Sequence, residues 1–376
     1  MNTLQVGLEW FSERAGGASR YYFDLYRHAR EPGVGFRGLV VGTGNIARET
    51  NGAVQAFSPR ERPVPARLLA ARRAIARRLR EEAPDLVVSH FALHAFPALD
   101  LIDRPLVCHF HGPWAEESGD GGRATLAIRA KAWIEAAVYR RARLNIVLSK
   151  AFGEILRRSY GVPWERIRVI PGAVDVDRFA VLGSRAEARA RLGWPSDRPI
   201  VLAVRRLVRR MGLENLIRAM RDVARQCPEA LLLIGGKGPL AGELAALVVE
   251  LGLETNVRLL GFIPDDALPL AYRAADVSVV PTAALEGFGL IAAESLAAGT
   301  PALVTPVGGL PEVVGDLSPG LVMEGAAVEC LSSAIGDVLS GVVELPTFAQ
   351  CREFARDRYS WRVVAARIGA AYREAI

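Results

Sequence analysis

Two glutamates, Glu286 and Glu294, follow an apolar run and are separated by seven residues that include Gly287 and Gly289. The glycines permit a tight turn into a helix, and the first backbone N–H groups of a helix bind anions. Glu294 would lie about 12 Å further along that helix, at 1.5 Å per residue. Carboxylates that far apart do not share a proton or a metal ion. They can hold the two ends of one elongated ligand, such as the hydroxyls of two sugars joined by a diphosphate.

Four of the histidines lie near the ends of two expected strands. His109 and His111 alternate along one strand, so they share a face, and His90 and His94 are four residues apart. Four imidazoles suggest a metal site, but no carboxylate or cysteine pattern completes one, and we expect none. His111 precedes Gly112 at the carboxyl end of its strand, which favours a place in an active-site loop.

Short apolar runs alternate with helical patterns along the first half of the chain, which is typical of parallel strands covered by helices on both faces. Helices are expected over Arg67–Glu82 and Ala124–Arg143, with a glycine-rich loop at residues 15–19. The expected strands are Leu4–Trp10, Val34–Val41, Asp85–Ser89, Pro105–Phe110 and Leu144–Leu148.

The same alternation restarts near residue 200. The expected strands are Ile200–Val204, Ala230–Ile234, Val257–Leu260, Val277–Val280 and Pro301–Val304. The expected helices are Leu213–Gln226, Leu240–Leu251, Asp265–Ala274, Leu290–Ala298 and an amphipathic Trp361–Ile376 with Val364, Ile368, Ala371 and Tyr372 on one stripe. The pattern predicts two doubly wound α/β domains, whose ligands bind beyond the carboxyl ends of the strands.

Length and composition agree with two globular domains. The chain has 376 residues, 51% of them hydrophobic and 23% charged, which excludes a disordered protein. No apolar run reaches the roughly 18–20 residues that cross a bilayer, and the first residues have no secretory pattern. We therefore expect a cytoplasmic location. The four cysteines are widely spaced and are expected to be reduced and buried.

Charge is unevenly distributed. Residues 1–180 hold 27 Lys+Arg and 19 Asp+Glu, a balance of +8, which leaves 20 and 22, a balance of −2, for residues 181–376. Arginines concentrate on the expected helix at Arg67–Arg80, and a basic amphipathic helix can bind an anionic membrane. Interleaved aromatics and nucleic-acid motifs are lacking, so we expect a peripheral membrane contact as an alternative to a solvated surface, and no nucleic acid.

Several segments of the second half resemble a known family. Val257–Pro264, the Glu286/Glu294 string, Gly299–Pro301 and Gly308–Glu312 are similar to the donor domain of the retaining glycosyltransferases of family 4. The resemblance covers nearly the whole chain, because it extends to Ile170–Asp175, Leu233–Leu240 and Tyr359–Trp361. It implies the GT-B fold: two Rossmann-like domains facing across a cleft. Residues 1–180 would bind the acceptor, residues 181–358 would bind the donor, and residues 359–376 would form a helix that crosses back.

The resemblance also implies roles for individual residues. The residues implied in catalysis are Glu286, on donor-sugar hydroxyls, His111, near the reacting sugar carbon, and Arg206, on the diphosphate. The residues implied in donor binding are Gly17, Arg210, Gly235, Ile263, Phe288, Gly289, Leu290 and Glu294, the last on the ribose. No metal is implied, and the DxD string at Asp175–Asp177 is expected to be structural.

One departure from the family pattern concerns charge. The family's donor domain begins with Gly-Arg-Leu and a later Lys-Gly pair, whose Arg and Lys neutralise the diphosphate. Here Arg206 matches the arginine, but Met211 stands at the lysine position. A thioether cannot stabilise a leaving diphosphate, so Arg205, Arg209 or Arg210 must compensate, or activity is reduced or altered.

The expected function is metal-independent, retaining transfer of a hexose-type sugar from a nucleotide-diphosphate sugar. The donor is a UDP- or GDP-sugar, and no further cofactor is expected. The acceptor hydroxyl belongs to a glycolipid, a polyprenyl-linked glycan or a small metabolite, with the loop at Ala115–Arg123 among the variable parts. Two alternatives remain. One is a catalytically impaired pseudo-glycosyltransferase that acts as a binding partner. The other is a glycosyl phosphorylase or epimerase on the same fold.

Overall fold

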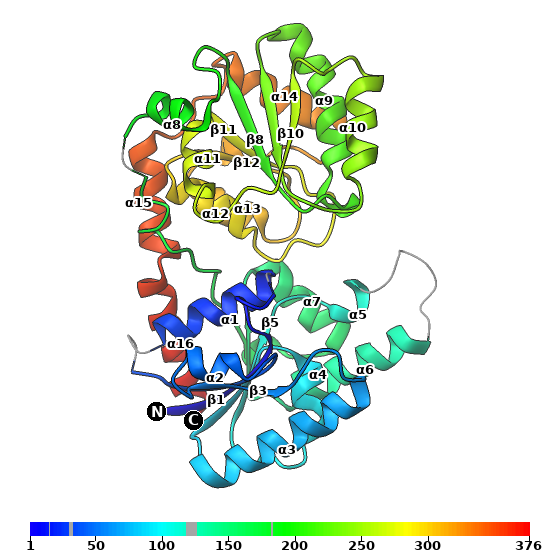
Figure 1. Ribbon diagram of the computed structural model, residues 1–376, viewed down its shortest axis with the longest axis vertical. Coiled ribbons are helices and arrows are strands. Elements are labelled where there is room, and N and C mark those ends of the chain that lie inside the picture. Colours follow the sequence, from blue (N-terminus) through cyan, green and yellow to red (C-terminus); the bar gives the residue numbers. More distant parts are fainter. Residues whose placement is uncertain (15, 30–32, 118–125, 182) are drawn as a thin grey trace. The chain divides into compact units, whose positions relative to one another are not determined.

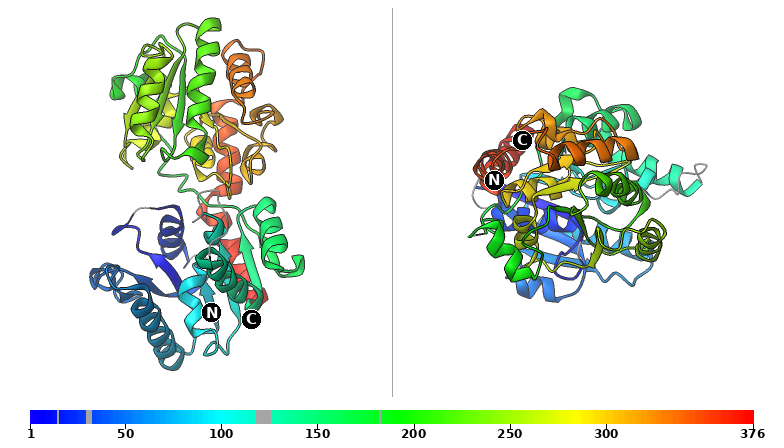
Figure 2. Two further views of the ribbon diagram at one scale, coloured as in Figure 1. Left: turned by 90° about the vertical axis from the view of Figure 1, so that its right-hand side faces the viewer. Right: turned by 90° about the horizontal axis from the view of Figure 1, so that it is seen from above.

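The computed structural model describes residues 1–14, 16–29, 33–117, 126–181 and 183–376, and it divides the chain into two compact units. Unit 1 comprises Met1–Gly172 with Trp361–Ile376, and unit 2 comprises Ala173–Ser360. The expected boundaries, after residues 180 and 358, lie eight and two residues away from these. Each unit is a parallel sheet between two layers of helices (Figures 1 and 2).

Unit 1 holds a seven-stranded parallel sheet in the order β3-β2-β1-β4-β5-β6-β7. The strands are β1 (Asn2–Glu9), β2 (Gly35–Val41), β3 (Val54–Ser58), β4 (Leu86–Ser89), β5 (Leu106–Phe110), β6 (Leu144–Val147) and β7 (Ile167–Val169). The sequence pattern did not predict the two edge strands, β3 and β7. Both are short and partly exposed, so neither forms a continuous apolar run.

The helices of unit 1 form two layers. On one face lie α1 (Gly17–His28), α2 (Asn45–Glu49) and α16 (Trp361–Ala375). On the other lie α3 (Val64–Glu82), α4 (Ala92–Ala95), α6 (Leu126–Arg141) and α7 (Lys150–Tyr160), with the short η1 (Phe96–Ala98), α5 (Trp114–Glu117) and η2 (Trp164–Arg166). Residues 124 and 125 of the expected α6, and residues 118–123 of the expected variable loop, lie outside the described residues.

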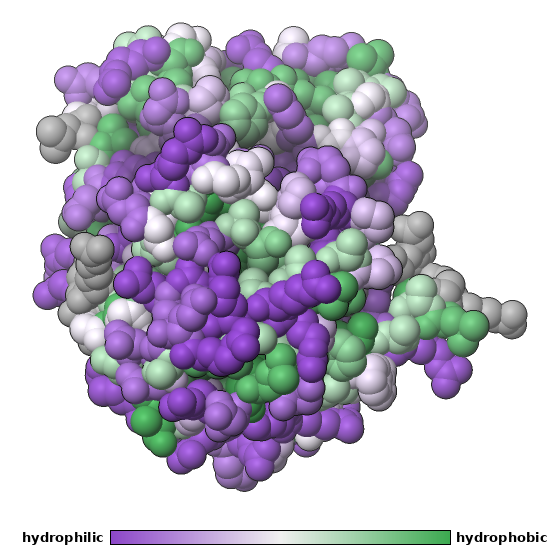
Figure 3. Space-filling view, turned by 60° about the horizontal axis from the view of Figure 1, so that its bottom comes forward, coloured by the Kyte–Doolittle hydropathy of each residue, from purple (hydrophilic) through white to green (hydrophobic). Residues whose placement is uncertain are grey.

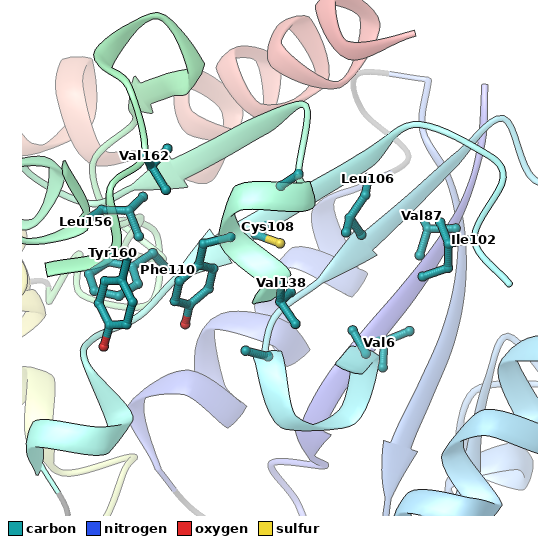
Figure 4. Packing of buried hydrophobic residues seen from close by; sticks show 14 of the residues in the cluster. Val6, Val87, Ile102, Leu106, Cys108, Phe110, Val138, Leu156, Tyr160 and Val162 are labelled. Atoms are coloured by element: carbon teal, nitrogen blue, oxygen red, sulfur yellow. The ribbon is translucent and has the colours of Figure 1, made fainter. Parts of the chain in front are cut away.

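The core of unit 1 joins its central strands to α6 and α7. Figure 4 shows Val87 beside Ile102 on one side of Val138, and Phe110 beside Leu156 and Tyr160 on the other. Cys108 lies in this core, where burial raises the pKa of its thiol. The four cysteines are free, but only Cys108 and Cys351 are buried, so the expectation of four buried thiols is wrong for Cys227 and Cys330. Those two lie on partly exposed positions.

Helix α16 returns the end of the chain to unit 1. Its expected apolar stripe is buried: Val364, Ile368, Ala371 and Tyr372 are at most 5% exposed. The helix packs along α1 and β5, where Trp361 stacks on His28 at a ring distance of 5.3 Å. The first and last parts of the chain therefore share one core.

Unit 2 holds a five-stranded parallel sheet in the order β10-β9-β8-β11-β12. The strands are β8 (Ile200–Val204), β9 (Leu231–Gly235), β10 (Val257–Gly261), β11 (Val277–Val280) and β12 (Ala302–Val304). All five were expected, and their bounds differ by at most one residue at either end. The three strands β8, β9 and β11 are buried nearly throughout, which is why their apolar runs are so legible in the sequence.

Helices cover both faces of this sheet as well. One layer is formed by α9 (Leu213–Gln226), α10 (Ala241–Glu250) and α14 (Val328–Leu339). The other is formed by α8 (Arg185–Leu192), α11 (Leu268–Ala274), α12 (Leu290–Ala297), α13 (Leu310–Val314) and α15 (Phe348–Tyr359). Two short turns, η3 (Arg209–Met211) and η4 (Pro319–Leu321), complete the unit. In the described part of the chain, no helix combines the length and the apolar character that a membrane span requires.

Candidate donor-binding site

The loop that leaves β11 carries the first glutamate into α12. Leu285 adopts a left-handed backbone with φ of 53°, and Gly289, with φ of 88°, starts the helix. The Glu286 carbonyl accepts a hydrogen bond from the Gly309 N–H at 3.0 Å. A Cβ on Gly308 would lie 1.9 Å from that carbonyl oxygen. The loops after β11 and β12 are therefore in direct contact, and this contact fixes the backbone of Glu286.

An arginine from the neighbouring strand holds the Glu286 carboxylate. Arg205 follows the last residue of β8, and its Nη2 donates to Oε2 of Glu286 at 2.6 Å and also to Oγ1 of Thr282. The two charged side chains are 8% and 16% exposed. Since β8 and β11 are neighbours, the pair lies at the carboxyl edge of the sheet, where ligands of doubly wound folds bind.

Glu294 is the fifth residue of α12, so it lies just over one turn from the start of the helix and not two turns, as the sequence suggested. It is half-buried and interacts with Tyr272 of α11. Burial, followed by the nearby Glu294 carboxylate, raises the pKa of the Tyr272 phenol well above its ordinary value. The two glutamates thus have different surroundings: one faces an arginine and the other a neutral phenol.

The turn after β9 lies beside Arg205. A Cβ on Gly236 would lie only 1.7 Å from the Arg205 carbonyl oxygen, so this position requires glycine. The structure also brings together two expected donor-binding residues here, because the Ile263 side chain covers Gly235. Next to them, the Lys237 ammonium lies 4.9 Å from the centre of the Phe262 ring.

The arginines around Met211 point in different directions. Met211 is 4% exposed, so the position at which the family has a lysine is part of the apolar core. Arg210 donates from Nη1 to the Leu285 carbonyl at 2.5 Å, which ties η3 to the glutamate loop. Arg209 is 73% exposed and pairs with Glu214 and Glu243, and no bond from its side chain to that loop is found among the described residues. Of the three alternatives for compensation, Arg205 and Arg210 therefore reach the loop and Arg209 does not.

The remaining donor-site expectations in unit 2 concern Arg206, Phe288 and Leu290. Arg206 is exposed, directly after Arg205. The Phe288 side chain is buried edge-on against Tyr359 at a ring distance of 5.4 Å, so the side chain anchors the loop and only the backbone amide could meet a ligand. Leu290 is the first residue of α12, and its amide is one of the unpaired N–H groups of the helix start.

The two expected site residues of unit 1 lie at the carboxyl ends of β1 and β5. Gly17 is the exposed first residue of α1, and a Cβ there would meet no atom within 4 Å. His111 follows β5 and packs edge-on against Tyr21 at 4.9 Å. Its Nε2 is buried with no hydrogen-bond partner among the described residues. Burial lowers the pKa of His111 to about 4, so the ring is neutral near pH 7.

Two further histidines stack on His111. The ligand nitrogens of His90, His109 and His111 lie within 4.8 Å of one another, which makes the group a candidate metal site. The rings are nearly parallel, with 18° between their planes, so lone pairs in those planes do not converge on one ion. Both nitrogens of His109 are also bonded, to Tyr21 and to Tyr372 of α16. The group fits a network of neutral imidazoles better than it fits a cation.

Glu135 is a site-adjacent residue that the sequence pattern did not indicate. This buried carboxylate of α6 accepts from the backbone N–H groups of Trp114 and Ala115 at 3.0 and 3.1 Å and from the Tyr160 hydroxyl at 2.9 Å. Burial raises its pKa. It fixes the segment that follows His111. A lone acid on the inner face of a helix is the only trace of it in the sequence.

Of the two aspartates of the DxD string, Asp175 has a structural role. Oδ1 of Asp175 accepts from the Arg178 backbone N–H at 3.1 Å and so closes a turn. Arg178 in turn donates to the Asp265 carbonyl at 2.6 Å.

Comparison with known families agrees with this geometry in both units. Residues 15–178 match the family model "Glycosyltransferase Family 4", and residues 184–358 match the model "Glycosyl transferases group 1". The chain belongs to glycosyltransferase family 4. The expected family is thereby confirmed.

Curated relatives in this family share about a third of the aligned residues. A protein of Mycolicibacterium smegmatis, named GDP-mannose-dependent alpha-(1-6)-phosphatidylinositol monomannoside mannosyltransferase, is 34% identical over 214 residues, 55% of this chain and 56% of that protein. A D-inositol 3-phosphate glycosyltransferase of Segniliparus rotundus is 33% identical over 225 residues, 59% of this chain and 50% of that protein. The chain thus spans about half the length of the curated relatives it matches.

Solved structures establish the fold of this family member. Sucrose-phosphate synthase from Thermosynechococcus elongatus superposes with a TM-score of 0.80 at 25% identity, covering 100% of this chain and 98% of that one. HepE of Anabaena, solved in complex with UDP, superposes with a TM-score of 0.81 at 20% identity, covering 100% of both chains. The fold is GT-B, as the sequence predicted.

Proposed function

We propose that this family 4 protein is a retaining glycosyltransferase, which moves a hexose-type sugar from a nucleotide-diphosphate sugar to a hydroxyl acceptor. The observation that supports this best is the carboxyl edge of the unit 2 sheet. There Glu286 is held by Arg205, Glu294 faces Tyr272, and the start of α12 offers free N–H groups. That combination suits a ligand with hydroxyls at both ends and an anionic middle.

The donor would lie along α12. Glu286 would accept hydrogen bonds from sugar hydroxyls, Glu294 would accept them from the ribose, and the amides of Gly289 and Leu290 would meet the diphosphate. Gly235 and Ile263 would border the nucleotide. Arg206 is exposed and adjacent to this edge, so it can place a permanent charge on the diphosphate oxygens.

In the reaction, the bond between the anomeric carbon and the diphosphate oxygen breaks, and a bond from the acceptor oxygen to the same carbon forms. The electron pair of the broken bond stays on the leaving diphosphate, which takes the acceptor proton. Attack from the same face retains the configuration. The contribution of the protein is mainly electrostatic, and losing one such interaction costs about 10²–10³ in rate.

Unit 1 would contribute a neutral imidazole. Because burial lowers the pKa of His111 to about 4, the ring does not carry a charge near pH 7. The residue is partly exposed and Nε2 is buried without a partner among the described residues, so a rotation of the side chain that exposes Nε2 would let His111 exchange a hydrogen bond with a sugar hydroxyl. Gly17, at the exposed start of α1, would approach the phosphate through its backbone.

The names of the relatives support the donor and acceptor classes that we propose. Their names include GDP-mannose, and HepE was solved with UDP, so we propose a UDP- or GDP-sugar. The mannosyltransferase relative acts on a phosphatidylinositol monomannoside and the other on an inositol phosphate, so a glycolipid or a small polyol phosphate is the acceptor we favour. A polyprenyl-linked glycan is a further candidate of the same hydroxyl chemistry.

A peripheral contact with anionic lipid is part of this proposal. Helix α3 exposes Val64 and Leu69 among its arginines, and α6 exposes Leu126 and Trp133. Figure 3 shows this side of the molecule, where apolar patches lie between larger hydrophilic areas. Co-sedimentation with vesicles containing anionic lipid at low salt tests the contact. Equal sedimentation with neutral and anionic vesicles would contradict it.

The proposed function is tested by thermal unfolding with UDP, GDP, ADP and TDP, each with and without EDTA. A ligand at 100 times its dissociation constant adds about 2.7 kcal/mol of stability. We expect one nucleotide to stabilise the protein equally with and without EDTA, and the corresponding nucleotide-sugar to be hydrolysed slowly. Nucleotide binding without any hydrolysis or transfer would instead favour the non-catalytic alternative, which the buried Met211 supports. No stabilisation by any of the four would contradict a donor site.

A further inference from the structure

The Arg205–Glu286 pair has more hydrogen-bonding capacity than it uses. Among the described residues, Oε2 of Glu286 accepts from Arg205, whereas no group donates to Oε1. On the arginine side, Nη2 has two acceptors, but Nε is buried with none. A carboxylate has about four acceptor positions, so Glu286 keeps one whole oxygen for a further donor.

The backbone on both sides of the pair is fixed. The Arg205 N–H donates to the Gly235 carbonyl at 2.9 Å, and Gly236 packs against the Arg205 carbonyl with no room for a Cβ. The Glu286 carbonyl is held by the Gly309 N–H at 3.0 Å. With both backbones fixed and Oε2 bonded, the direction in which Oε1 points is determined by Arg205.

Stability alone does not explain such a pair. A buried ion pair gains little over apolar residues of the same volume, and a buried charged donor without an acceptor is costly. In a doubly wound sheet, a cost of this kind at the carboxyl edge of neighbouring strands is typical of a ligand site. The family pattern noted above has glycine where this chain has Arg205, so the arginine is an addition in this chain.

We propose that Arg205 is a positioning residue that selects the donor sugar. It holds Oε2 of Glu286 and leaves Oε1 as the acceptor for a sugar hydroxyl. Oε1 is an acceptor, so it takes a hydroxyl that can donate to it, whereas a hexuronate carboxylate at the same place would have no proton to donate and would be repelled by Glu286. The proposal rests on the donor site of the proposed function.

The test compares free nucleotide with nucleotide-sugar. Wild type, Arg205→Met and Arg205→Lys are titrated calorimetrically with UDP and UDP-glucose and with GDP and GDP-mannose, in EDTA. A hydrogen bond to a charged group contributes enough that its loss weakens binding about ten- to a hundredfold. We expect Arg205→Met to weaken the nucleotide-sugar by that factor while free nucleotide changes less than about twofold. Arg205→Lys, which keeps the charge, should recover most of the difference.

The matched control is Arg189→Met. Arg189 also forms a buried pair, with Asp276 at 2.6 Å, but at the amino end of the same sheet. This variant should unfold more easily and keep the wild-type ratio of nucleotide-sugar to nucleotide affinity. Wild type should also bind UDP-glucuronate more weakly than UDP-glucose, if the nucleotide is UDP.

Three results would overturn the proposal. Equal weakening of free nucleotide and nucleotide-sugar by Arg205→Met would assign Arg205 to the diphosphate, and unchanged affinities would assign it no role. If Arg205→Met does not fold, the Arg205→Lys variant is used in its place. If that variant binds the nucleotide-sugar no more tightly than it binds the free nucleotide, the result would count against positioning. Failure of wild type to bind any nucleotide would instead overturn the proposed function itself.

Discussion

The two ends of the unit 2 sheet each carry a buried arginine–carboxylate pair, and the pairs differ in how completely they are bonded. At the amino end, Arg189 donates to Asp276, to the Ala274 carbonyl and to the carbonyls of Ser196 and Arg198. Both Asp276 oxygens are used as well, since they accept from Arg185 and from the first amide of β8. The pair of Arg189 and Asp276 is therefore fully bonded, although Nε of the neighbouring Arg185 is buried without a partner among the described residues.

At the carboxyl end, the pair of Arg205 and Glu286 leaves Oε1 and Nε without partners among the described residues. The two pairs have the same 2.6 Å separation and similar burial. Separation and burial therefore do not tell a structural ion pair from one at a binding site, whereas the number of bonds still available does. The difference between the two pairs predicts an effect on stability at the amino end of the sheet and an effect on activity at the carboxyl end.

The largest expected effect is on stability, at the amino end. Arg189→Met removes the buried partner of Asp276, whose side chain is 28% exposed and keeps Arg185, and it leaves three backbone carbonyls without their donor. Removing one partner of a buried pair costs about 3–5 kcal/mol, and we expect a loss towards the lower end of that range. Urea unfolding measures this change. A loss below about 1 kcal/mol, the size of an exposed ion pair, would mean that the fully bonded pair is not structural.

The next effect is on activity, at the carboxyl end. Glu286→Ala removes the proposed sugar acceptor, and we expect transfer to fall by about 10²–10³ while the fold remains intact. Rates of nucleotide release from the donor, with circular dichroism as the control for folding, measure it. Full activity in this variant would remove Glu286 from the site.

A smaller effect follows from the contact between the loops after β11 and β12. Gly308→Ala places a Cβ 1.9 Å from the Glu286 carbonyl oxygen, at a φ of 58°. We expect a loss of about 1–3 kcal/mol, together with weaker donor binding, because the glutamate must shift. Gly252→Ala is the matched control, since its φ is 64° but no atom lies within 4 Å of the new Cβ. Equal donor affinities in the two variants would contradict a fixed Glu286.

The smallest effect is a dependence of stability on pH, and it arises in unit 1 alone. All five histidines lie in unit 1, and burial lowers the pKa of His94 and of His111 to about 4, and those of His90 and His109 well below their ordinary value. Below pH 6.5 the unfolded chain binds protons that these folded imidazoles do not. Stability should therefore fall as the pH drops from 6.5 towards 4, and the share of His111 in this fall is at most about 1.4 kcal/mol per pH unit.

Unfolding of wild type and His111→Asn between pH 7.5 and 5 measures this dependence. The variant should show a shallower slope, by at most one proton. Identical slopes would mean that His111 is not buried as a neutral ring.

The sequence predicted β8, β9, β11 and β12 of unit 2 well because they are buried and so read as unbroken apolar runs, while β10 was predicted although most of its residues are at least partly exposed. It missed β3 and β7, whose residues are mostly only partly buried, so that neither forms a continuous apolar run. The motif from Glu286 to Glu294 could be recognised because its glycines and the expected start of a helix are close together in the sequence. The pairing of Arg205 with Glu286 could not be predicted from the sequence, because it depends on β8 and β11 being neighbours in the sheet. Glu135 was hidden for the same reason, because three of its four partners, Trp114, Ala115 and Tyr160, come from other elements.

The central claim is that the carboxyl edge of unit 2 binds a nucleotide-sugar for transfer. Its most direct test is release of nucleotide diphosphate from UDP- and GDP-sugars in EDTA, by wild type and by Glu286→Ala, followed by NMR of the released or transferred sugar. We predict that wild type releases nucleotide from one donor without metal, with retention at the anomeric carbon, and that Glu286→Ala does so at least about a hundredfold more slowly. Release by neither protein, or equal release by both, would contradict the claim.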